Sequence, residues 1–253
     1  REAGAPVEYV GHPLVDVVKS DLDREGARKA FRCEGADPVV ALLPGSRRQE
    51  IDNLLGPMVQ AAKRFAGVHP AVKYLVPIAH TVDRARVRAK LPESLPIEIV
   101  EGRTYDALRA SDFALAAMGT VTLEAALMGT PIVGLYRVAP STAWIIRRLY
   151  TGRHFALPNI VAGREIVREL LQDDVTPERI TEAMEELLSP ERRRAILEGY
   201  EEVRARLGGP GAVSRAAEAV LRIARGKARK GRSGEAHRSE RTASEGGSGA
   251  PER

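Results

Sequence analysis

The sequence predicts an α/β protein: a doubly wound parallel sheet, followed by C-terminal helices and a disordered tail. Three observations support this prediction. Short apolar runs typical of fully buried strands alternate with amphipathic helices between residues 37 and 175. Helix-start signals without further strands follow in residues 176–225, and residues 226–253 lack apolar periodicity.

Ahead of the sheet, the sequence predicts short helices over residues 13–19 and 24–31, and residues 8–10 are typical of the end of a strand. A strand without an earlier partner predicts that further sequence precedes Arg1. We therefore assign residues 1–36 to the end of an N-terminal domain and to an interdomain connection.

Five apolar runs predict the strands of the sheet domain, residues 37–175. Because these runs contain few charged residues, both faces of the sheet are expected to be covered. The intervening helices carry apolar residues at helical spacing, such as Leu54, Leu55 and Met58. The predicted strands cover residues 39–43, 73–78, 96–100, 112–117 and 131–136, and the predicted helices cover residues 49–66, 82–91, 105–110 and 121–128.

Two matching signals start the C-terminal helices of residues 176–225. The TPE run at 176–178 and the SPE run at 189–191 each combine an N-cap hydroxyl, a proline at the first helical position and an acid in the first turn. A last helix is expected over residues 212–225. The basic tail, residues 226–253, is too polar to fold, and solvated disorder is favoured over contact with anionic lipid or RNA.

The composition fits a globular protein and excludes several classes of partner. Hydrophobic residues make up 43% and charged residues 29% of the 253 residues, and no apolar run approaches the roughly 18 residues of a spanning helix. Cys33 is the one cysteine, so no disulfide or cysteine-based zinc site can form within the chain. Much of the net charge of +5 lies in the tail, and only 4% of residues are aromatic. The charge distribution and the low aromatic content therefore predict no nucleic-acid partner. We also expect no metal and no other cofactor.

Ligands of open α/β sheets bind outside the carboxyl ends of the strands, where the first candidate loop is PGSRRQE at 44–50. Gly45 allows close backbone approach to a ligand, and Arg47 can bind a phosphate through two N–H groups. Ser46 and Gln49 also match a capping box that starts the next helix. Both interpretations can hold, because a capped helix N-terminus is itself an anion site.

The second candidate loop runs from a strand into Gly119, Thr120 and a helix. Free backbone N–H groups at the helix start, with the Thr120 hydroxyl, suit a diphosphate. Glu124 lies one turn into the helix, where its carboxylate could accept both hydroxyls of a ribose, although spacing alone fits a surface glutamate better. The loop is neither a Walker loop nor a dinucleotide fingerprint, because Gly-Lys-Ser/Thr and G-x-G-x-x-G are both absent.

The third candidate is LPNIVAGRE at 157–165, where Asn159 and the Gly-Arg pair fit either turn chemistry or a ligand-facing loop. Two further features carry weaker signals. His12 has no partner at metal-ligand spacing and predicts a loop or interdomain contact. The aromatic and basic residues at 144–150 predict a core-facing helix with a basic edge rather than a helix on an anionic membrane.

Taken together, four motifs resemble those of the bacterial lipid-A-disaccharide synthase family and occur in the family's order. The resemblance spans about residues 9–225. One departure is Met118, which stands where the family usually has serine, so that one hydroxyl donor near the phosphates is lost. The motifs are LPNIVAGRE at 157–165, which is the most specific, and YVGHPL at 9–14, LPGSR at 43–47 and GTVTLE at 119–124.

The resemblance implies that the chain is the C-terminal half of a GT-B fold, in which two Rossmann-like domains face a cleft. The domain at residues 37–175 would bind a UDP-sugar, with Glu124 on the ribose and Asn159 lining the donor cleft. No residue matches the aspartate that the family is proposed to use as a base, so we assign no catalytic residue and expect no turnover from this chain alone. The implied UDP-sugar-binding residues are Ser46, Arg47, Gly119, Thr120, Glu124 and Asn159.

The implied reaction transfers a diacylglucosamine unit from UDP-2,3-diacylglucosamine to 2,3-diacylglucosamine 1-phosphate (lipid X), with inversion and release of UDP, in lipid A biosynthesis. It implies a cytoplasmic protein, peripheral at the anionic inner face of the cytoplasmic membrane of a Gram-negative bacterium. Two alternatives stay open. One is another UDP-sugar enzyme of this fold, such as a 2-epimerase or a lipid II-forming transferase; the other is a non-catalytic nucleotide-binding module.

Overall fold

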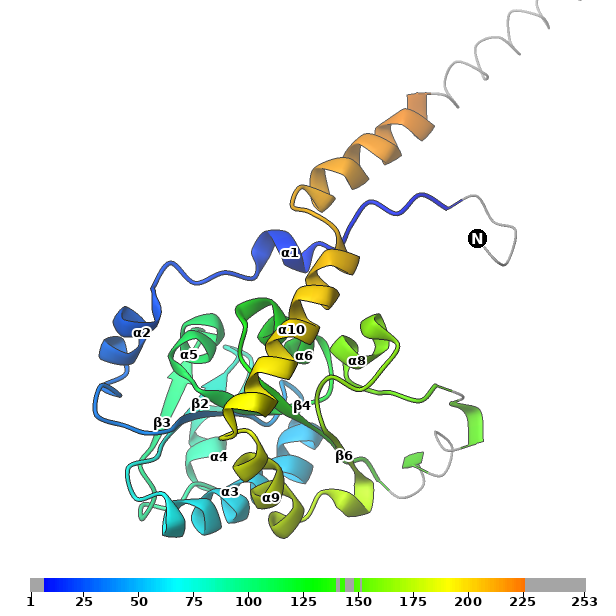
Figure 1. Ribbon diagram of the computed structural model, residues 1–253. Coiled ribbons are helices and arrows are strands. Elements are labelled where there is room, and N and C mark those ends of the chain that lie inside the picture. Colours follow the sequence, from blue (N-terminus) through cyan, green and yellow to red (C-terminus); the bar gives the residue numbers. More distant parts are fainter. Residues whose placement is uncertain (1–6, 140–141, 144–147, 151, 226–253) are drawn as a thin grey trace, which may run out of the picture. The chain divides into compact units, whose positions relative to one another are not determined.

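The computed structural model describes residues 7–139, 142–143, 148–150 and 152–225 (Figure 1). Within them, a six-stranded parallel sheet has the order β3-β2-β1-β4-β5-β6. The predicted doubly wound sheet is therefore confirmed, and strand order reverses between β1 and β4. The strands are β1 (Val39–Leu43), β2 (Lys73–Ile78), β3 (Ile97–Glu101), β4 (Phe113–Ala117), β5 (Ile132–Tyr136) and β6 (Glu169–Leu171).

Helices cover both faces of this sheet, as Figure 1 shows. Helix α3 packs with α9 on one face, whereas α5, α6, α8 and α10 contact one another on the other face. A further helix covers residues 212–225. The labelled helices are α1 (Leu14–Val17), α2 (Arg24–Ala30), α3 (Arg48–Val68), α4 (Arg84–Arg88), α5 (Thr104–Ala110), α6 (Thr120–Met128), α8 (Leu157–Ala162), α9 (Pro177–Glu186) and α10 (Pro190–Leu207).

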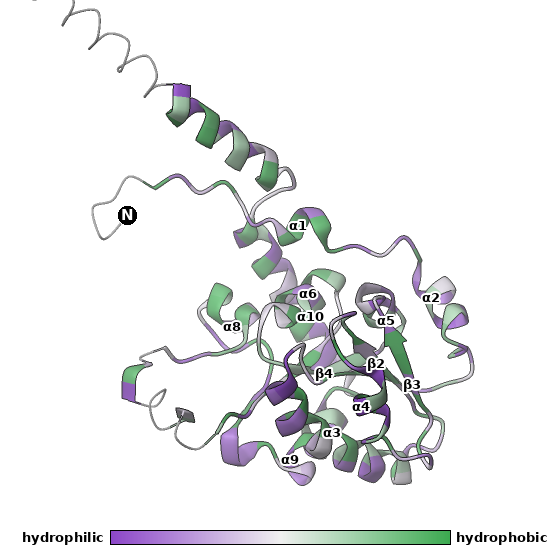
Figure 2. Cartoon of the chain, turned by 180° about the vertical axis from the view of Figure 1, so that it is seen from behind, coloured by the Kyte–Doolittle hydropathy of each residue, from purple (hydrophilic) through white to green (hydrophobic). Residues whose placement is uncertain are grey.

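The central strands are buried along their whole length. All residues of β1 and β4 are buried, as expected for parallel strands with helices on both sides. In Figure 2 the helices carry both hydrophobic and hydrophilic residues, in keeping with one face packed on the sheet and one in solvent. The predicted helix starts at Thr176 and Ser189 are confirmed, because each hydroxyl accepts a backbone N–H of the first turn.

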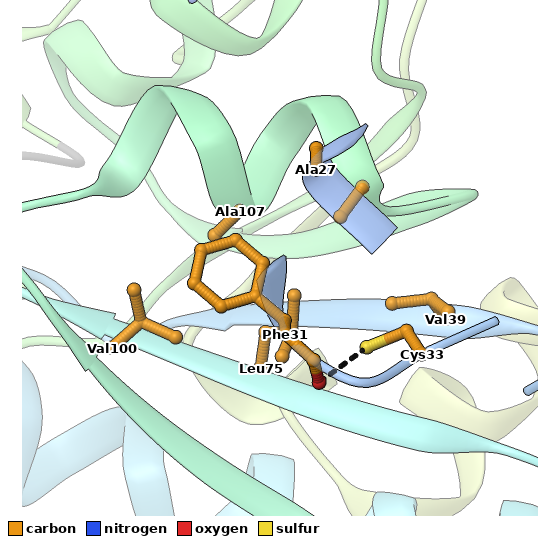
Figure 3. Packing of buried hydrophobic residues seen from close by; sticks show 8 residues of the cluster. Ala27, Phe31, Cys33, Val39, Leu75, Val100 and Ala107 are labelled. Atoms are coloured by element: carbon orange, nitrogen blue, oxygen red, sulfur yellow. Dashed lines mark hydrogen bonds between the residues drawn. The ribbon is translucent and has the colours of Figure 1, made fainter. Parts of the chain in front are cut away.

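The segment before β1 is part of this packing. Figure 3 shows Phe31 of this segment among Leu75, Val100 and Ala107, residues of the sheet and of α5. Cys33 is fully buried, its thiol donates to the Phe31 carbonyl at 3.2 Å, and burial raises its pKa. The thiol therefore has a packing role, since a buried neutral thiol is a poor nucleophile.

The chain forms two compact units, residues 17–208 and a second unit made of residues up to 16 and from 209 onward. In the second unit, the Asp16 carboxylate accepts the N–H groups of Gly211 (2.5 Å) and Val213 (3.4 Å), and the bond from Gly211 is the largest cause of its lowered pKa. The Val10 carbonyl accepts from the Arg215 guanidinium at 2.9 Å.

The strand expected at residues 8–10 was a wrong prediction, since residues 7–12 form no strand. A side chain, not a neighbouring strand, binds the Val10 carbonyl. The helix predicted over 82–91 is shorter than expected and covers Arg84–Arg88.

Two predictions concern residues that lie largely outside the part of the chain that the structure describes. The tail at 226–253 lies outside the described residues, as does most of the helix predicted at 144–150. The described end of that helix, residues 148–150, is exposed, so the core-facing position predicted for it is wrong there. Among the described residues, none of the helices has the length and apolar content needed to cross a bilayer.

Candidate functional site

A cavity of about 480 Å³ opens at the carboxyl ends of β1 and β4, where the strand order reverses. The two strands pair in parallel with Leu43 opposite Ala116, so the loops that follow them meet at this edge. Such a switch point is where open α/β sheets bind their ligands. The lining includes all the predicted site residues except Asn159, namely Ser46, Arg47, Gly119, Thr120 and Glu124.

The first loop owes its shape to Gly45 and Glu50. Gly45 has φ +110°, and a Cβ there would lie 2.3 Å from the Glu50 carboxylate. That carboxylate accepts the backbone N–H groups of Ser46 at 3.0 Å and Arg47 at 3.2 Å. The predicted Ser46–Gln49 capping box is therefore wrong: the cap residue is Arg47, and Glu50 supplies the capping carboxylate because the left-handed turn at Gly45 directs both amides toward it.

Arg47 supplies an exposed positive charge at the cavity. Its guanidinium binds Glu50 through one nitrogen at 2.9 Å, and 82% of its side chain is exposed. A guanidinium has five N–H donors, so further donors remain for an anion. The neighbouring Arg48 is similarly exposed but pairs with Asp52 at 3.8 Å and does not line the cavity.

The second loop supplies fixed backbone dipoles. Helix α6 begins at Thr120, and its N-cap, Gly119, has no side chain with which to cap the first amides. The positive end of the helix dipole therefore faces the cavity, as predicted for an anion site. Met118 also lines the cavity, and its methyl group packs on Gly134, where a Cβ would come within 3.1 Å.

Glu124 lies where two cavities meet. Besides the first cavity, it lines an adjoining one of about 410 Å³, together with Thr104 and Tyr105. Burial raises the pKa of the Glu124 carboxyl, and a hydrogen bond with Thr120 lowers it in part. Burial and the Glu124 charge also raise the pKa of Tyr105. A half-buried carboxylate in this position is a strong acceptor for hydroxyl groups that enter from either cavity.

The structure does not bring Asn159 into either cavity. Its side chain is fully buried, and its amide oxygen accepts the N–H groups of Ile166 and Val167 at 2.7 and 2.9 Å. Its amide nitrogen donates to the Val167 carbonyl and to Glu169, each at 2.8 Å. Asn159 thus holds the chain that leaves α8, and all its bonding capacity is used inside the protein.

Sequence reasoning missed two residues of the site. Glu50 lies three positions after the cap residue Arg47, which is the spacing of a capping acid. It was missed because Gln49 lies at the same spacing from Ser46, a more usual cap residue. Thr104 begins the helix after β3 and lines both cavities. Its place in the loop that follows the strand predicted at 96–100 was the signal that could have found it.

A larger cavity, of about 810 Å³, lies at the opposite edge of the sheet. It is lined by Asp37 and Asp112, which precede β1 and β4, and by residues of α10 such as Arg193 and Glu198. This edge carries the amino ends of the strands, and although α10 begins beside the cavity, four carboxylates (Asp37, Asp112, Glu198 and Glu201) line it, so it is the less suitable edge for an anionic ligand. In the described part of the chain, no cluster of His, Cys, Asp or Glu could hold a metal ion. The Nδ1 atom of His12 accepts a hydrogen bond from the Leu14 backbone N–H.

Comparison with known sequences identifies relatives over most of the chain. The profile of a family described as lipid-A-disaccharide synthetase matches residues 1–223. A lipid-A-disaccharide synthase of Myxococcus xanthus (strain DK1622) is 43% identical over 226 residues, which are 88% of this chain and 59% of that protein. One from Syntrophus aciditrophicus (strain SB) is 40% identical with the same coverage. The chain thus spans about three fifths of the length of these relatives.

Solved structures show the same fold at low identity. The C-terminal domain of a group 1 glycosyl transferase, LpcC from Francisella tularensis, has a TM-score of 0.53 at 12% identity, covering 76% of this chain and 96% of that domain. The S. aureus MnaA–UDP co-structure has a TM-score of 0.54 at 16% identity, covering 82% and 52%. The described sheet thus has the fold of a glycosyltransferase C-terminal domain.

Proposed function

The chain belongs to the lipid-A-disaccharide synthetase family, and from this we propose that its cavity at the carboxyl edge binds the UDP-sugar donor of that reaction. The proposal rests on one observation: donor and acceptor groups from separate segments of the chain meet in one cavity. Arg47 and the Gly119–Thr120 amides come from different crossovers and line one cavity with the Glu124 carboxylate. In UDP a ribose follows the diphosphate. A site for UDP therefore needs N–H donors for the phosphates and, next to them, an acceptor for the ribose hydroxyls.

In the proposed complex, the diphosphate binds between the first and second loops. Negative charge builds on the UDP diphosphate as the sugar leaves, and groups that are already oriented stabilise this charge with little reorganisation. The α6 amides are such fixed groups, and the Thr120 hydroxyl beside them donates to Glu124. Arg47 and Ser46, which line the other wall, close on the phosphates from the solvent side.

We assign the nucleoside to Glu124 and to the adjoining cavity. The carboxylate has two oxygens and accepts one hydrogen bond on each from the two ribose hydroxyls. The base then extends into the cavity lined by Thr104 and Tyr105. Asn159 contributes by holding α8, since its side chain has no donor left for the sugar.

For the whole enzyme we propose transfer of the diacylglucosamine unit to lipid X, which gives the lipid A disaccharide and UDP. Family membership favours this reaction over a 2-epimerase or a lipid II-forming transferase. Both substrates carry acyl chains, so we place the reaction on the anionic inner surface of the cytoplasmic membrane. Arg148, Leu149 and Tyr150 are exposed and suit such a surface. Co-sedimentation with anionic vesicles tests this placement, and a chain that stays in the supernatant contradicts it.

Calorimetric titration of UDP into the purified chain tests the donor site. We expect a Kd in the micromolar to millimolar range, and about tenfold weaker binding for Arg47→Ala, because a guanidinium–phosphate hydrogen bond is charge-assisted. Arg48→Ala is the matched control: it removes the same charge one residue away but no cavity contact. Absence of UDP binding, or equal losses in both variants, contradicts the proposed site.

A further inference from the structure

Thr122 lies beneath the proposed phosphate site and touches no ligand cavity. It is fully buried in the first turn of α6. Its hydroxyl donates to the Gly119 carbonyl at 2.7 Å, and the same carbonyl accepts the Thr122 N–H at 3.2 Å. The hydroxyl oxygen also accepts the N–H of Leu157, the first residue of α8, at 3.2 Å.

The bond to Gly119 fixes the direction of an amide in the cavity. The C=O of Gly119 and the N–H of Thr120 belong to one trans peptide unit, in which the two groups point in opposite directions. Because Thr122 holds the carbonyl toward the protein interior, the Thr120 N–H is directed outward, to the cavity that Gly119 and Thr120 line. A change in this carbonyl's direction would turn the amide away from an anion.

The second bond ties this orientation to α8, which is itself firmly anchored. The Glu169 carboxylate accepts the N–H groups of Phe155 and Ala156 at 2.9 to 3.1 Å, and Asn159 donates to the same carboxylate. The amide of Leu157, next in sequence, is therefore held in place to meet Thr122. The hydrogen bonds of Glu169 and Asn159 therefore hold the chain on both sides of Leu157, and the Leu157–Thr122 bond joins this anchored segment to the second loop.

We propose that Thr122 is a positioning residue for phosphate binding: by bonding Leu157 and Gly119 at once, it holds the Thr120 amide toward the diphosphate. The inference rests on the proposed UDP site. It also gives the LPN segment of residues 157–159 a role in phosphate binding that needs no contact with the ligand. Uridine, which has no phosphate, does not use the Thr120 amide and is therefore insensitive to Thr122.

Thr122→Val tests the inference, because valine keeps the shape of threonine but has neither donor nor acceptor. We expect UDP binding to weaken about tenfold, the loss typical of one charge-assisted hydrogen bond, while uridine binding followed by saturation-transfer NMR stays within about twofold. Thr122→Ser retains the hydroxyl and is expected to restore UDP binding to within about twofold of the unaltered chain.

Thr130→Val is the matched control for loss of a buried hydroxyl. Thr130 is 3% exposed, and its hydroxyl donates to the Leu108 carbonyl at 2.9 Å beyond the other end of α6. This variant is expected to lower Tm without changing UDP affinity. Unchanged UDP binding by Thr122→Val, equal losses for UDP and uridine, or an equal loss in Thr130→Val overturns the inference while the UDP site stands. Absence of UDP binding by the unaltered chain overturns the proposed function as well.

Discussion

At the scale of single residues, Glu124 lowers the stability of the fold when it is ionised, and it is also the residue that we propose binds the ribose. Because burial raises its pKa, the folded chain binds the Glu124 proton more tightly than the unfolded chain does. Its contribution to stability is therefore fully present below the ordinary pKa of glutamate and is lost as pH rises through the raised value. Above that pH the ionised carboxylate destabilises the fold, and the proposed contact with the ribose gives a reason for this cost in stability.

Glu124→Gln separates these two effects. We expect the difference in Tm, variant minus unaltered chain, to increase from pH 4 to pH 7.5, because glutamine has no carboxylate to ionise. UDP binding at pH 7.5 should weaken by about tenfold, since the amide replaces one acceptor oxygen by a donor. Thermal melts and calorimetry measure both. Glu93→Gln, at an exposed position, is the control and should show neither change. A Tm difference that does not vary with pH contradicts the argument.

The residues of the first loop show how far sequence reasoning extends at this scale. Residue type and position after a strand predicted that Arg47 would face the ligand edge, and Arg47 does line the cavity. The capping partner could not be read in the same way, because Gln49 and Glu50 are adjacent and both can cap a helix. The choice is made by the φ of +110° at Gly45, which is a property of the folded loop.

At the scale of elements, segments with an unbroken apolar run or a clear helical spacing were predictable, whereas β6 and α8, which lack such a pattern, were not. Helix α3 and strands β1, β2 and β4 lie close to their predicted bounds because their apolar patterns are long or unbroken. Strand β6 has three residues, too few for any pattern, and is defined by its pairing with β5 through Gly134 and Glu169. The helix at 157–162 was missed because its sequence also fits turn chemistry, and buried bonds to Asn159 and Glu169 stabilise it.

Asn159→Ala tests whether Asn159 stabilises α8 and the chain that follows it or binds the ligand. The change leaves the buried N–H groups of Ile166 and Val167 without their acceptor, so we expect the free energy of unfolding to fall by about 2–5 kcal/mol. Urea denaturation measures it. Ile160→Ala, on the same helix at a side chain that is 46% exposed, should cost much less. Weaker UDP binding without loss of stability would instead place Asn159 in the donor cleft, as its motif predicted.

At the scale of the whole molecule, the site follows from the strand order. Alternating strands and helices predicted a parallel sheet, but not which strands are neighbours. Because β1 pairs with β4 rather than with β2 alone, the loops at 44–50 and 117–120 become adjacent although β2 and β3 separate them in sequence. The whole proposed site, including Glu124, lies within the unit of residues 17–208. Ligand binding should therefore leave the second unit unchanged.

Hydrogen exchange with and without saturating UDP tests this at the molecular scale. Amides that donate to a ligand exchange only when the ligand leaves, so we expect slower exchange in residues 44–50 and 117–124. Residues 188–201, which include the α10 wall of the larger cavity, and the helix over 212–225 should exchange at the same rate in both conditions. The Arg47→Ala variant should show less protection of the same two loops at equal UDP concentration. Protection concentrated at 188–201 would move the ligand to the amino edge of the sheet, and the convergence of Arg47, Gly119 and Glu124 would then need another explanation.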